Sequence, residues 1–275
     1  MLTPSLLRII LVIVKLFVDW KFCEAGLRII GGRNALKDEF PFAVRLEIQL
    51  PETRNGTEYF EYHQFCTGTA LSPSWILTAA HCYTEGKKFA RYNSYFPEEL
   101  GHLSPITKVI AHPSFIFDEF SSITRVKYDL ALYQTEKLKI SSYGKISAID
   151  YTTFVGHEVF VLGFGITNAS ALEKPLQVLK GILINCDERI SQGLIGMLCI
   201  VPQCGLEASV CPGDSGGPAV HASGIVGVHS ITYTLCERFD HGLLRPGLPS
   251  DIITMVSPVV DWISKIVANE TDNSP

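Results

Sequence analysis

Short apolar stretches separated by turn residues are the feature that most limits how this chain of 275 residues can fold. Between Val44 and Leu50, apolar and polar residues alternate, which is the pattern of a strand with one buried face. Clusters of Gly, Pro, Asn and Ser separate further stretches of this kind, at 70–79, 108–112, 130–133, 157–163, 176–184 and 224–230. Many short strands favour an all-β protein built from barrels or sandwiches.

A helical pattern occurs at the C-terminus. Ser257 is a candidate cap, Pro258 suits a first helical turn, and the apolar residues that follow fall on one face. This pattern predicts a helix that packs on the core. A polar stretch, 135–145, divides the chain near its middle and is the best candidate for a linker.

The N-terminus has the layout of a signal peptide. Arg8 precedes an apolar run, 9–18, that only Lys15 interrupts, and a short pattern suited to cleavage ends at Ala25. The run is far shorter than the roughly 20 apolar residues that cross a membrane, so a stable membrane anchor is the minor alternative. The sequence predicts a signal peptide over 1–25 and a secreted protein.

Composition excludes one class of partner and favours one kind of cross-link. Lys and Arg number 23 against 28 Asp and Glu, a net charge of -5, so the chain lacks the basic excess of a nucleic-acid-binding protein. Eight cysteines in a secreted chain favour disulfides, and their spacing does not suit a zinc site. Sequons at Asn55, Asn168 and Asn269 fit a glycoprotein.

Three separate segments carry residues suited to nucleophilic catalysis. Residues 211–218 place Ser215 among three glycines, which permit a tight loop whose N–H groups can point at a reacting carbonyl. His81 directly precedes a cysteine at the end of an apolar strand, and Asp129 stands at the start of another. Taken singly, these segments also fit an ordinary glycine turn, a core histidine and a turn aspartate.

Together the three segments resemble the chymotrypsin-like serine peptidase family, in which they occur in the order His, Asp, Ser. His81 and Asp129 are 48 positions apart, Asp129 and Ser215 are 86 apart, and the likeness runs from Ile29 through the final helix. The resemblance implies that Ser215 is the nucleophile, His81 its general base and Asp129 the group that orients the imidazole. It also implies an oxyanion hole formed by the N–H groups of Gly213 and Ser215.

The same resemblance implies an all-β fold of two six-stranded antiparallel barrels with a C-terminal α-helix. The implied bounds are 29–275 for the peptidase domain, about 29–140 for barrel one, about 141–257 for barrel two and about 258–268 for the helix. The implied reaction is hydrolysis of protein or peptide substrates through an acyl-enzyme. No metal and no cofactor are expected, since the family's calcium loop is not recognisable between His81 and Asp129.

Residues 28–32 resemble the activation site of the family. Cleavage after Arg28 would remove a short propeptide, 26–28, and free the amino group of Ile29. In the family this group pairs with the aspartate before the nucleophile, here Asp214, and so biases the oxyanion loop towards its working shape. We therefore expect a zymogen, with a trypsin-like protease as the activating partner and protein inhibitors as a further class of partner.

The likeness also implies which cysteines pair. The three expected disulfides are Cys66–Cys82, Cys186–Cys199 and Cys211–Cys236. They would staple the histidine loop, a surface loop and the specificity pocket. Cys23 leaves with the signal peptide if cleavage follows Ala25, which makes Cys204 odd; a retained Cys23 could instead pair with it.

The primary specificity pocket is the last feature that the resemblance implies. Ser209 falls at its base, Val210 adds apolar lining, and Ser230, Thr232 and Gly247 are expected in its walls. Trypsin-like enzymes have an aspartate at the position of Ser209, so selection for Arg or Lys is not expected. Thr232 narrows the entrance, which favours small or medium apolar side chains before the scissile bond.

Two departures from the family pattern argue against vigorous catalysis. Ile231 stands where tryptophan is usual, and Pro212 precedes the oxyanion glycine. Neither removes a catalytic group, because the oxyanion hole does not use the N–H that Pro212 lacks. The alternative is a protease-like binding protein with weak or no catalysis, and a serine endopeptidase is the leading interpretation.

Overall fold

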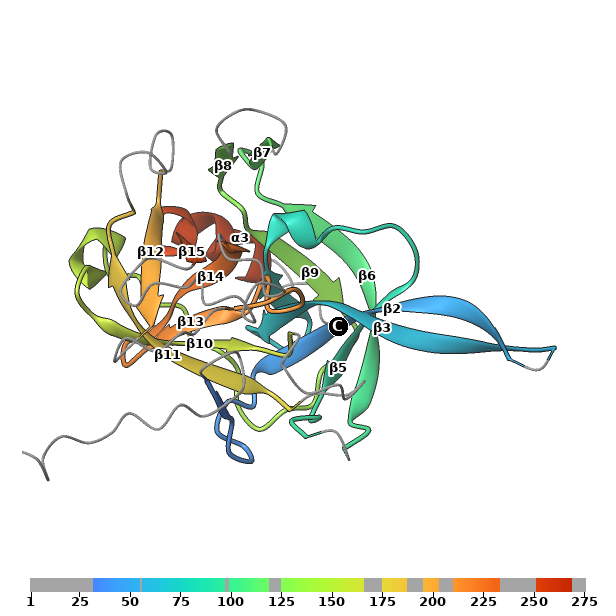
Figure 1. Cartoon of the computed structure of the whole chain (residues 1–275). Coiled ribbons are helices and arrows are strands. Elements are labelled where there is room, and N and C mark those ends of the chain that lie inside the picture. Colours follow the sequence, from blue (N-terminus) through green and yellow to red (C-terminus); the bar gives the residue numbers. More distant parts are fainter. Residues whose placement is uncertain are drawn as a thin grey trace, which may run out of the picture.

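The computed structural model describes residues 32–54, 56–96, 99–118, 125–165, 175–186, 195–202, 210–232 and 251–268. Two rings of antiparallel strands form its body, as Figure 1 shows. The predicted signal peptide, the activation site and the three sequons lie outside the described residues.

The first ring is a closed barrel with the strand order β2-β3-β4-β9-β6-β5. Its strands are β2 (Ala43–Arg54), β3 (Thr57–Ala70), β4 (Trp75–Thr78), β5 (Lys88–Tyr92), β6 (His102–Ala111) and β9 (Ala131–Thr135). Apolar side chains fill its interior, and Leu46, Leu77 and Leu132 have no exposed surface. Each such side chain contributes about 1.5–3 kcal/mol through burial, which favours closure of the barrel over an open sheet.

The second ring also has six strands, and the pairing of β11 with β12 closes it. Its strands are β10 (Glu158–Gly163), β11 (Gln177–Ile184), β12 (Met197–Pro202), β13 (Pro218–His221), β14 (Gly224–Thr232) and β15 (Asp251–Met255). The short strand β1 (Arg33–Asn34) adds to the free edge of β11. Two six-stranded antiparallel barrels confirm the predicted fold class.

The predicted C-terminal helix is α3 (Val260–Ala268), which follows the 3₁₀ turn η5 (Ser257–Val259). Ile263 is buried in the core of barrel one, so the helix ties the end of the second barrel to the first. Ser257 does not cap the helix as predicted, because its hydroxyl accepts the N–H of Tyr151 at 3.0 Å. Among the described residues, no helix combines the length and the apolar character that crossing a membrane requires.

Two strands differ from the sequence-based expectation. The stretch 70–79 is interrupted because Ser72 turns the chain: its hydroxyl accepts the N–H groups of Ser74 and Trp75. Strands β2 and β3 continue beyond Leu50 and stay paired until Arg54 lies opposite Thr57. This two-stranded arm projects from the barrel into solvent (Figure 1), and most of its side chains are exposed.

A short hairpin of β7 (Ile116–Asp118) and β8 (Arg125–Lys127) lies outside both barrels.

The three predicted catalytic residues lie near the ends of barrel strands. His81 is in the 3₁₀ turn η1 (Ala80–Cys82) that follows β4, and Asp129 precedes β9 by two residues. Because β4 and β9 are neighbours, with Thr78 opposite Ala131, their ends bring these two side chains together. Ser215 comes from barrel two, in the loop that leads into β13.

Candidate active site

His81 and Asp129 form a close pair. The Nδ1 atom of His81 lies 2.6 Å from Oδ2 of Asp129, and the backbone N–H of His81 donates to Oδ1 of the same carboxylate at 2.9 Å. Asp129 is completely buried, whereas the His81 side chain is 21% exposed. The carboxylate thus fixes both the position and the tautomer of the imidazole, leaving Nε2 to act as a proton acceptor.

The surroundings of Asp129 favour its charged form. Burial alone would raise the pKa of this carboxyl, but hydrogen bonds from the His81 ring, from Ser230 and from the His81 backbone outweigh burial and lower the pKa. Ser230 donates its hydroxyl to Oδ2 at 2.5 Å. The charge next to the imidazole is therefore retained at neutral pH, and it can stabilise an imidazolium.

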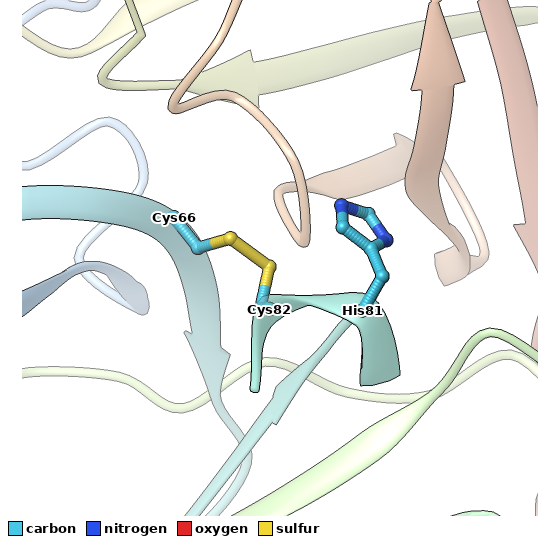
Figure 2. A group of neighbouring side chains, drawn as sticks. All are labelled: Cys66, His81 and Cys82. Atoms are coloured by element: carbon cyan, nitrogen blue, oxygen red, sulfur yellow. A yellow bond between two sulfur atoms is a disulfide. The ribbon is translucent and has the colours of Figure 1, made fainter. Parts of the chain in front are cut away.

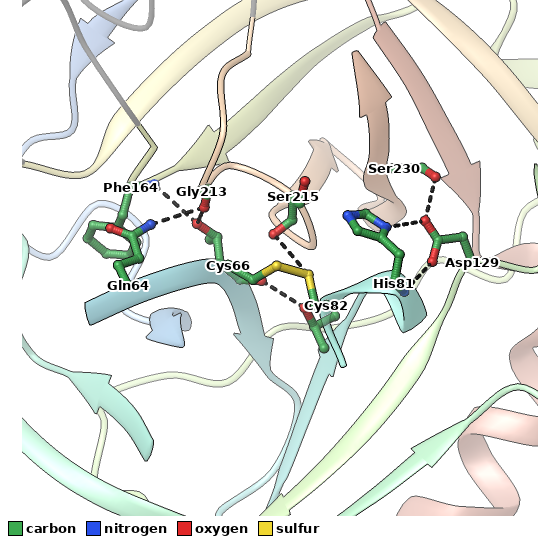
Figure 3. Close-up of a disulfide and its surroundings, with 11 residues drawn as sticks. Gln64, Cys66, His81, Cys82, Asp129, Phe164, Gly213, Ser215 and Ser230 are labelled. Carbon is green, nitrogen blue, oxygen red and sulfur yellow. Dashed lines mark hydrogen bonds and ion pairs between the residues drawn. A yellow bond between two sulfur atoms is a disulfide. The ribbon is translucent and has the colours of Figure 1, made fainter. Parts of the chain in front are cut away.

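Ser215 lies across the junction of the barrels from this pair. Thr67 in β3 donates its N–H to the Ser215 carbonyl at 2.8 Å, and Cys82 Sγ lies 3.7 Å from the same oxygen. Figure 3 shows the second ring nitrogen of His81 on the side of Ser215. Among the described residues, no hydrogen bond joins the Ser215 hydroxyl to that ring. Such catalytic bonds are often long without substrate and shorten when it binds.

The nucleophile loop leaves two main-chain donors unused. The N–H groups of Asp214, Gly216 and Gly217 donate to backbone carbonyls, whereas within the described residues those of Gly213 and Ser215 have no acceptor. Gly213 has a φ of +97°, a conformation that residues with a side chain rarely adopt. The two N–H groups without an acceptor are those of the predicted oxyanion donors, whose role stays a prediction.

Two residues that the sequence did not single out hold the oxyanion loop. The Thr67 hydroxyl donates to the Gly213 carbonyl at 2.8 Å and accepts the N–H of Phe164 at 3.1 Å. Gln64 Nε2 donates to the same carbonyl at 3.0 Å (Figure 3). We call Thr67 and Gln64 the oxyanion brace. Gln64 lies two positions before Cys66 and Thr67 one position after it. The sequence identified Cys66 as a disulfide cysteine, but only the contact between the barrels shows that its two neighbours bind the Gly213 carbonyl.

Disulfides fix the histidine turn and a loop of barrel two. Cys66 is bonded to Cys82 and Cys186 to Cys199, which are two of the three expected pairs. Cys211 is also disulfide-bonded, but its expected partner Cys236 lies outside the described residues, so that pairing stays a prediction.

Among the residues that the structure describes, two groups of three side chains have the spacing of metal ligands. In the first, Cys66 and Cys82 lie beside His81 (Figure 2), but the disulfide occupies both sulfur atoms, so neither is a thiolate. The second, Glu52, Glu61 and His63, stands on the exposed arm, where the imidazole lies 3.5 and 3.9 Å from the two carboxylates. Exposed acidic groups are common without a bound ion, so this group alone does not indicate a metal site.

Asp214 is buried directly under the nucleophile loop. Its two carboxylate oxygens accept the backbone N–H groups of Gly165 at 2.6 Å and of Cys211 at 2.7 Å. Arg28 and Ile29, the predicted activation site, lie outside the described residues. The described contacts show how the carboxylate connects the loop to barrel two, and the pairing with Ile29 stays a prediction.

The predicted pocket residues are described only in part. Val210 and Ser230 are buried and Thr232 is half-buried, while Ser209 and Gly247 lie outside the described residues. Ser230 has a contact that the sequence did not predict, since its hydroxyl is directed at Asp129.

Comparison with known proteins agrees with this architecture, which is that of a chymotrypsin-like serine peptidase. The family model for trypsin matches residues 29–263. Granzyme M of Homo sapiens is 28% identical over 255 residues, covering 88% of this chain and 90% of its own. Trypsin of Phaedon cochleariae is 27% identical over 257 residues, with coverages of 87% and 88%. The chain therefore belongs to the trypsin family of serine proteases.

Two further similarities extend the comparison. Chymotrypsin-like elastase family member 1 of Homo sapiens is 25% identical over 265 residues, covering 90% of this chain and 95% of its own. The solved structure of neuropsin, a serine protease expressed in the limbic system of mouse brain, superposes with a TM-score of 0.64 at 19% identity. It covers 86% of this chain and 98% of its own, and the likeness supports the fold.

Proposed function

We propose that this chain is a serine endopeptidase that hydrolyses peptide bonds through an acyl-enzyme. In this proposal His81 takes the proton of Ser215 as the hydroxyl attacks the scissile carbonyl, and later gives a proton to the leaving amine. Asp129 holds the imidazole and stabilises its charged form. The 2.6 Å contact between Nδ1 of His81 and Oδ2 of Asp129 is the observation that carries the proposal.

The oxyanion intermediate is assigned to the N–H groups of Gly213 and Ser215. A donor at such a site is typically worth about 3 kcal/mol of barrier, because it binds charge that develops only in the transition state. The absence of any acceptor for these two groups among the described residues supports this role.

Activation is proposed to follow cleavage after Arg28. The amino group of Ile29 would then enter the protein and pair with Asp214. The complete burial of the Asp214 carboxylate supports this step, since a buried charge gains from an opposite charge. An activating protease of trypsin-like specificity, protein or peptide substrates and protein inhibitors are the proposed partners.

The location and the pocket preference belong to the same proposal. The signal-peptide pattern of residues 1–25 and the disulfides support a secreted protein. At the pocket, Thr232 supports a narrow entrance, and Ser209 brings no charge to the base. On those two residues alone, small or medium apolar side chains would be preferred before the scissile bond.

The proposal is tested with activated protein and its Ser215→Ala variant. The parent should hydrolyse members of a peptide library and react with a serine-directed phosphonate, and Ser215→Ala should do neither. Retained phosphonate labelling in Ser215→Ala would refute the nucleophile. A correctly processed parent that cleaves no peptide would favour the alternative of a protease-like binding protein, for which Ile231 and the unusual pocket are the best support.

A further inference from the structure

Two histidines of barrel two lie side by side, and the proposed mechanism uses neither. His157 immediately precedes β10 and is exposed, and His221 ends β13 and is half-buried. The Nδ1 atom of His157 lies 3.4 Å from Nε2 of His221, and the ring centroids are 5.4 Å apart. Within the described part of the chain, no carboxylate forms an ion pair with either ring, so charge pairing does not explain why the two rings meet.

The fold brings the two rings together from positions that are 64 residues apart in the sequence. Strands β10 and β13 are antiparallel neighbours, with Phe160 opposite Val220, so the start of β10 lies beside the end of β13. The N–H of His157 donates to the Phe154 carbonyl at 2.9 Å, and the His157 carbonyl accepts the N–H of Leu183 at 3.0 Å. The backbone of His157 is therefore held on both sides although its side chain is exposed.

A buried phenylalanine orients both imidazoles. Phe154 ends the 3₁₀ turn η2 (Tyr151–Phe154) and is 2% exposed. Its ring contacts the His221 ring at a centroid distance of 5.0 Å and the His157 ring at 5.9 Å, both edge to face. Aromatic pairs of this geometry are favourable, and the core of barrel two holds the phenyl ring. The two imidazoles thus rest on a rigid base that keeps them together.

The separation of the two nitrogen atoms is that of neighbouring ligands on one metal ion. Tetrahedral zinc binds imidazole nitrogen at about 2.0–2.1 Å, which puts two ligand nitrogens about 3.4 Å apart and their ring centroids about 5.3 Å apart. The values for His157 and His221 are 3.4 and 5.4 Å. A straight hydrogen bond of the same length would put the centroids about 5.7 Å apart. The two rings are therefore inclined towards a common point beside them.

The far side of the His221 ring supplies the support that a metal-bound imidazole needs. Nδ1 of His221 accepts the N–H of Ser223 at 3.1 Å, which places the ring proton on Nε2, between the two histidines. A metal ion at Nε2 would shift this proton to Nδ1, where the Ser223 hydroxyl, 2.9 Å away, can accept it. Ser223 is exposed, so its N–H can bond to water instead. The Ser147 hydroxyl lies 2.9 Å from that of Ser223 and holds it in place.

We propose that His157 and His221 bind one divalent transition-metal ion, with Cu²⁺ held more tightly than Zn²⁺. Imidazole suits both ions and Cu²⁺ forms the stronger complexes, whereas Ca²⁺ and Mg²⁺ require oxygen ligands. Water completes the coordination, because the two histidines leave positions open. Ser215 precedes β13 and His221 ends it, so the ion takes no part in the proposed hydrolysis and the inference does not depend on it. The ion ties the end of β13 to the segment before β10.

The first test is calorimetric titration of ZnCl₂ and of CuCl₂ into full-chain Ser215→Ala protein that carries no histidine tag. Both ions should bind, Cu²⁺ at least about tenfold more tightly than Zn²⁺. His157→Gln changes an exposed side chain and should fold as the parent does, but it should weaken zinc binding by at least about 100-fold, as should His221→Gln. His63→Gln, in the group of possible ligands on the exposed arm, is the matched control and should bind zinc as the parent does.

A second test separates a metal site from an ordinary hydrogen bond between the rings. Zinc should raise the temperature of thermal unfolding of the Ser215→Ala protein, since it binds the folded chain, and should not do so in His157→Gln. Ser223→Ala should weaken zinc binding by about tenfold through loss of the hydroxyl that accepts the His221 proton. The inference is overturned if the parent binds no zinc, if His157→Gln binds it as the parent does, or if His63→Gln is the variant that loses it.

Discussion

The Thr67 hydroxyl donates a hydrogen bond of 2.8 Å to the carbonyl of Gly213, across the junction of the two barrels. This bond fixes the peptide group that follows the proposed oxyanion donor at Gly213. An oxyanion hole is effective when its donors are held in place before the reaction. Thr67 is therefore expected to act as a positioning residue although it does not touch the substrate.

Thr67→Val should lower kcat by about fivefold to tenfold with little change in KM, because one hydrogen bond of about 1 kcal/mol is lost from the loop. Inhibition constants for a peptide aldehyde, which forms a tetrahedral adduct, should rise by the same factor. Thr67→Ser should restore both. Thr69→Val is the matched control, since the Thr69 hydroxyl lies in the same strand, is equally buried and has no hydrogen-bond partner among the described atoms. An equal loss of kcat in both valine variants would contradict a positioning role for the oxyanion brace.

Ser230→Ala should destabilise the fold through Asp129. The buried carboxylate loses its 2.5 Å donor, and a hydrogen bond to a charged group is worth about 1.5–3 kcal/mol. The folded-state pKa of Asp129 is lowered, so this stability is present above the ordinary aspartate range and is lost as the pH falls through the folded pKa. Chemical denaturation at pH 7 and at pH 3, of Ser215→Ala protein with and without Ser230→Ala, measures this difference in the free energy of unfolding. Ser147→Ala, which removes a bond to a neutral hydroxyl, should cost less.

His229 should make the protein sensitive to mild acid. Burial lowers its pKa to about 3 in the fold, against about 6.5 in the unfolded chain, so the unfolded state binds the proton first as the pH falls below about 6.5. Stability is therefore lost with falling pH, by up to about 1.4 kcal/mol per pH unit, until the folded pKa is reached. His229→Val should flatten the stability curve between pH 6.5 and 5. Identical slopes in parent and variant over that range would show that the imidazole does not titrate on unfolding.

Arg28→Gln should prevent activation. Trypsin added to the parent should produce a chain that begins at Ile29, detected by N-terminal sequencing, together with the appearance of peptidase activity. The variant should yield neither, because glutamine has no charge for the activating enzyme to bind. Arg33→Gln, five residues further on, is the control and should be processed as the parent is. Activity in uncleaved Arg28→Gln protein would mean that cleavage does not switch the chain on.

Local sequence patterns predicted the strands and the final helix because their alternation reflects burial on one face. The arm beyond Leu50 was missed because Pro51 and the polar residues after it resemble a loop, and only pairing with β3 makes them a strand. The segments around His81, Asp129 and Ser215 could be found from the sequence because each carries a recognisable local run of residues.

The contacts between distant segments could not be read in the same way. Nothing in the sequence around Thr67 indicates that its hydroxyl meets the Gly213 carbonyl. The position of Asp251 opposite Thr232 could not be predicted, because the chain before β15 cannot be aligned by pattern alone. Only the β14–β15 register shows which residue stands opposite Thr232.

The Cys66–Cys82 bond joins the strand that carries Gln64 and Thr67 to the turn that carries His81. In the proposed mechanism, proton transfer and stabilisation of the oxyanion thus share one covalent tether, although the groups concerned belong to different parts of the barrel. A reductant that opened this bond would release both functions at once, so loss of activity in a thiol-rich compartment should be abrupt rather than graded.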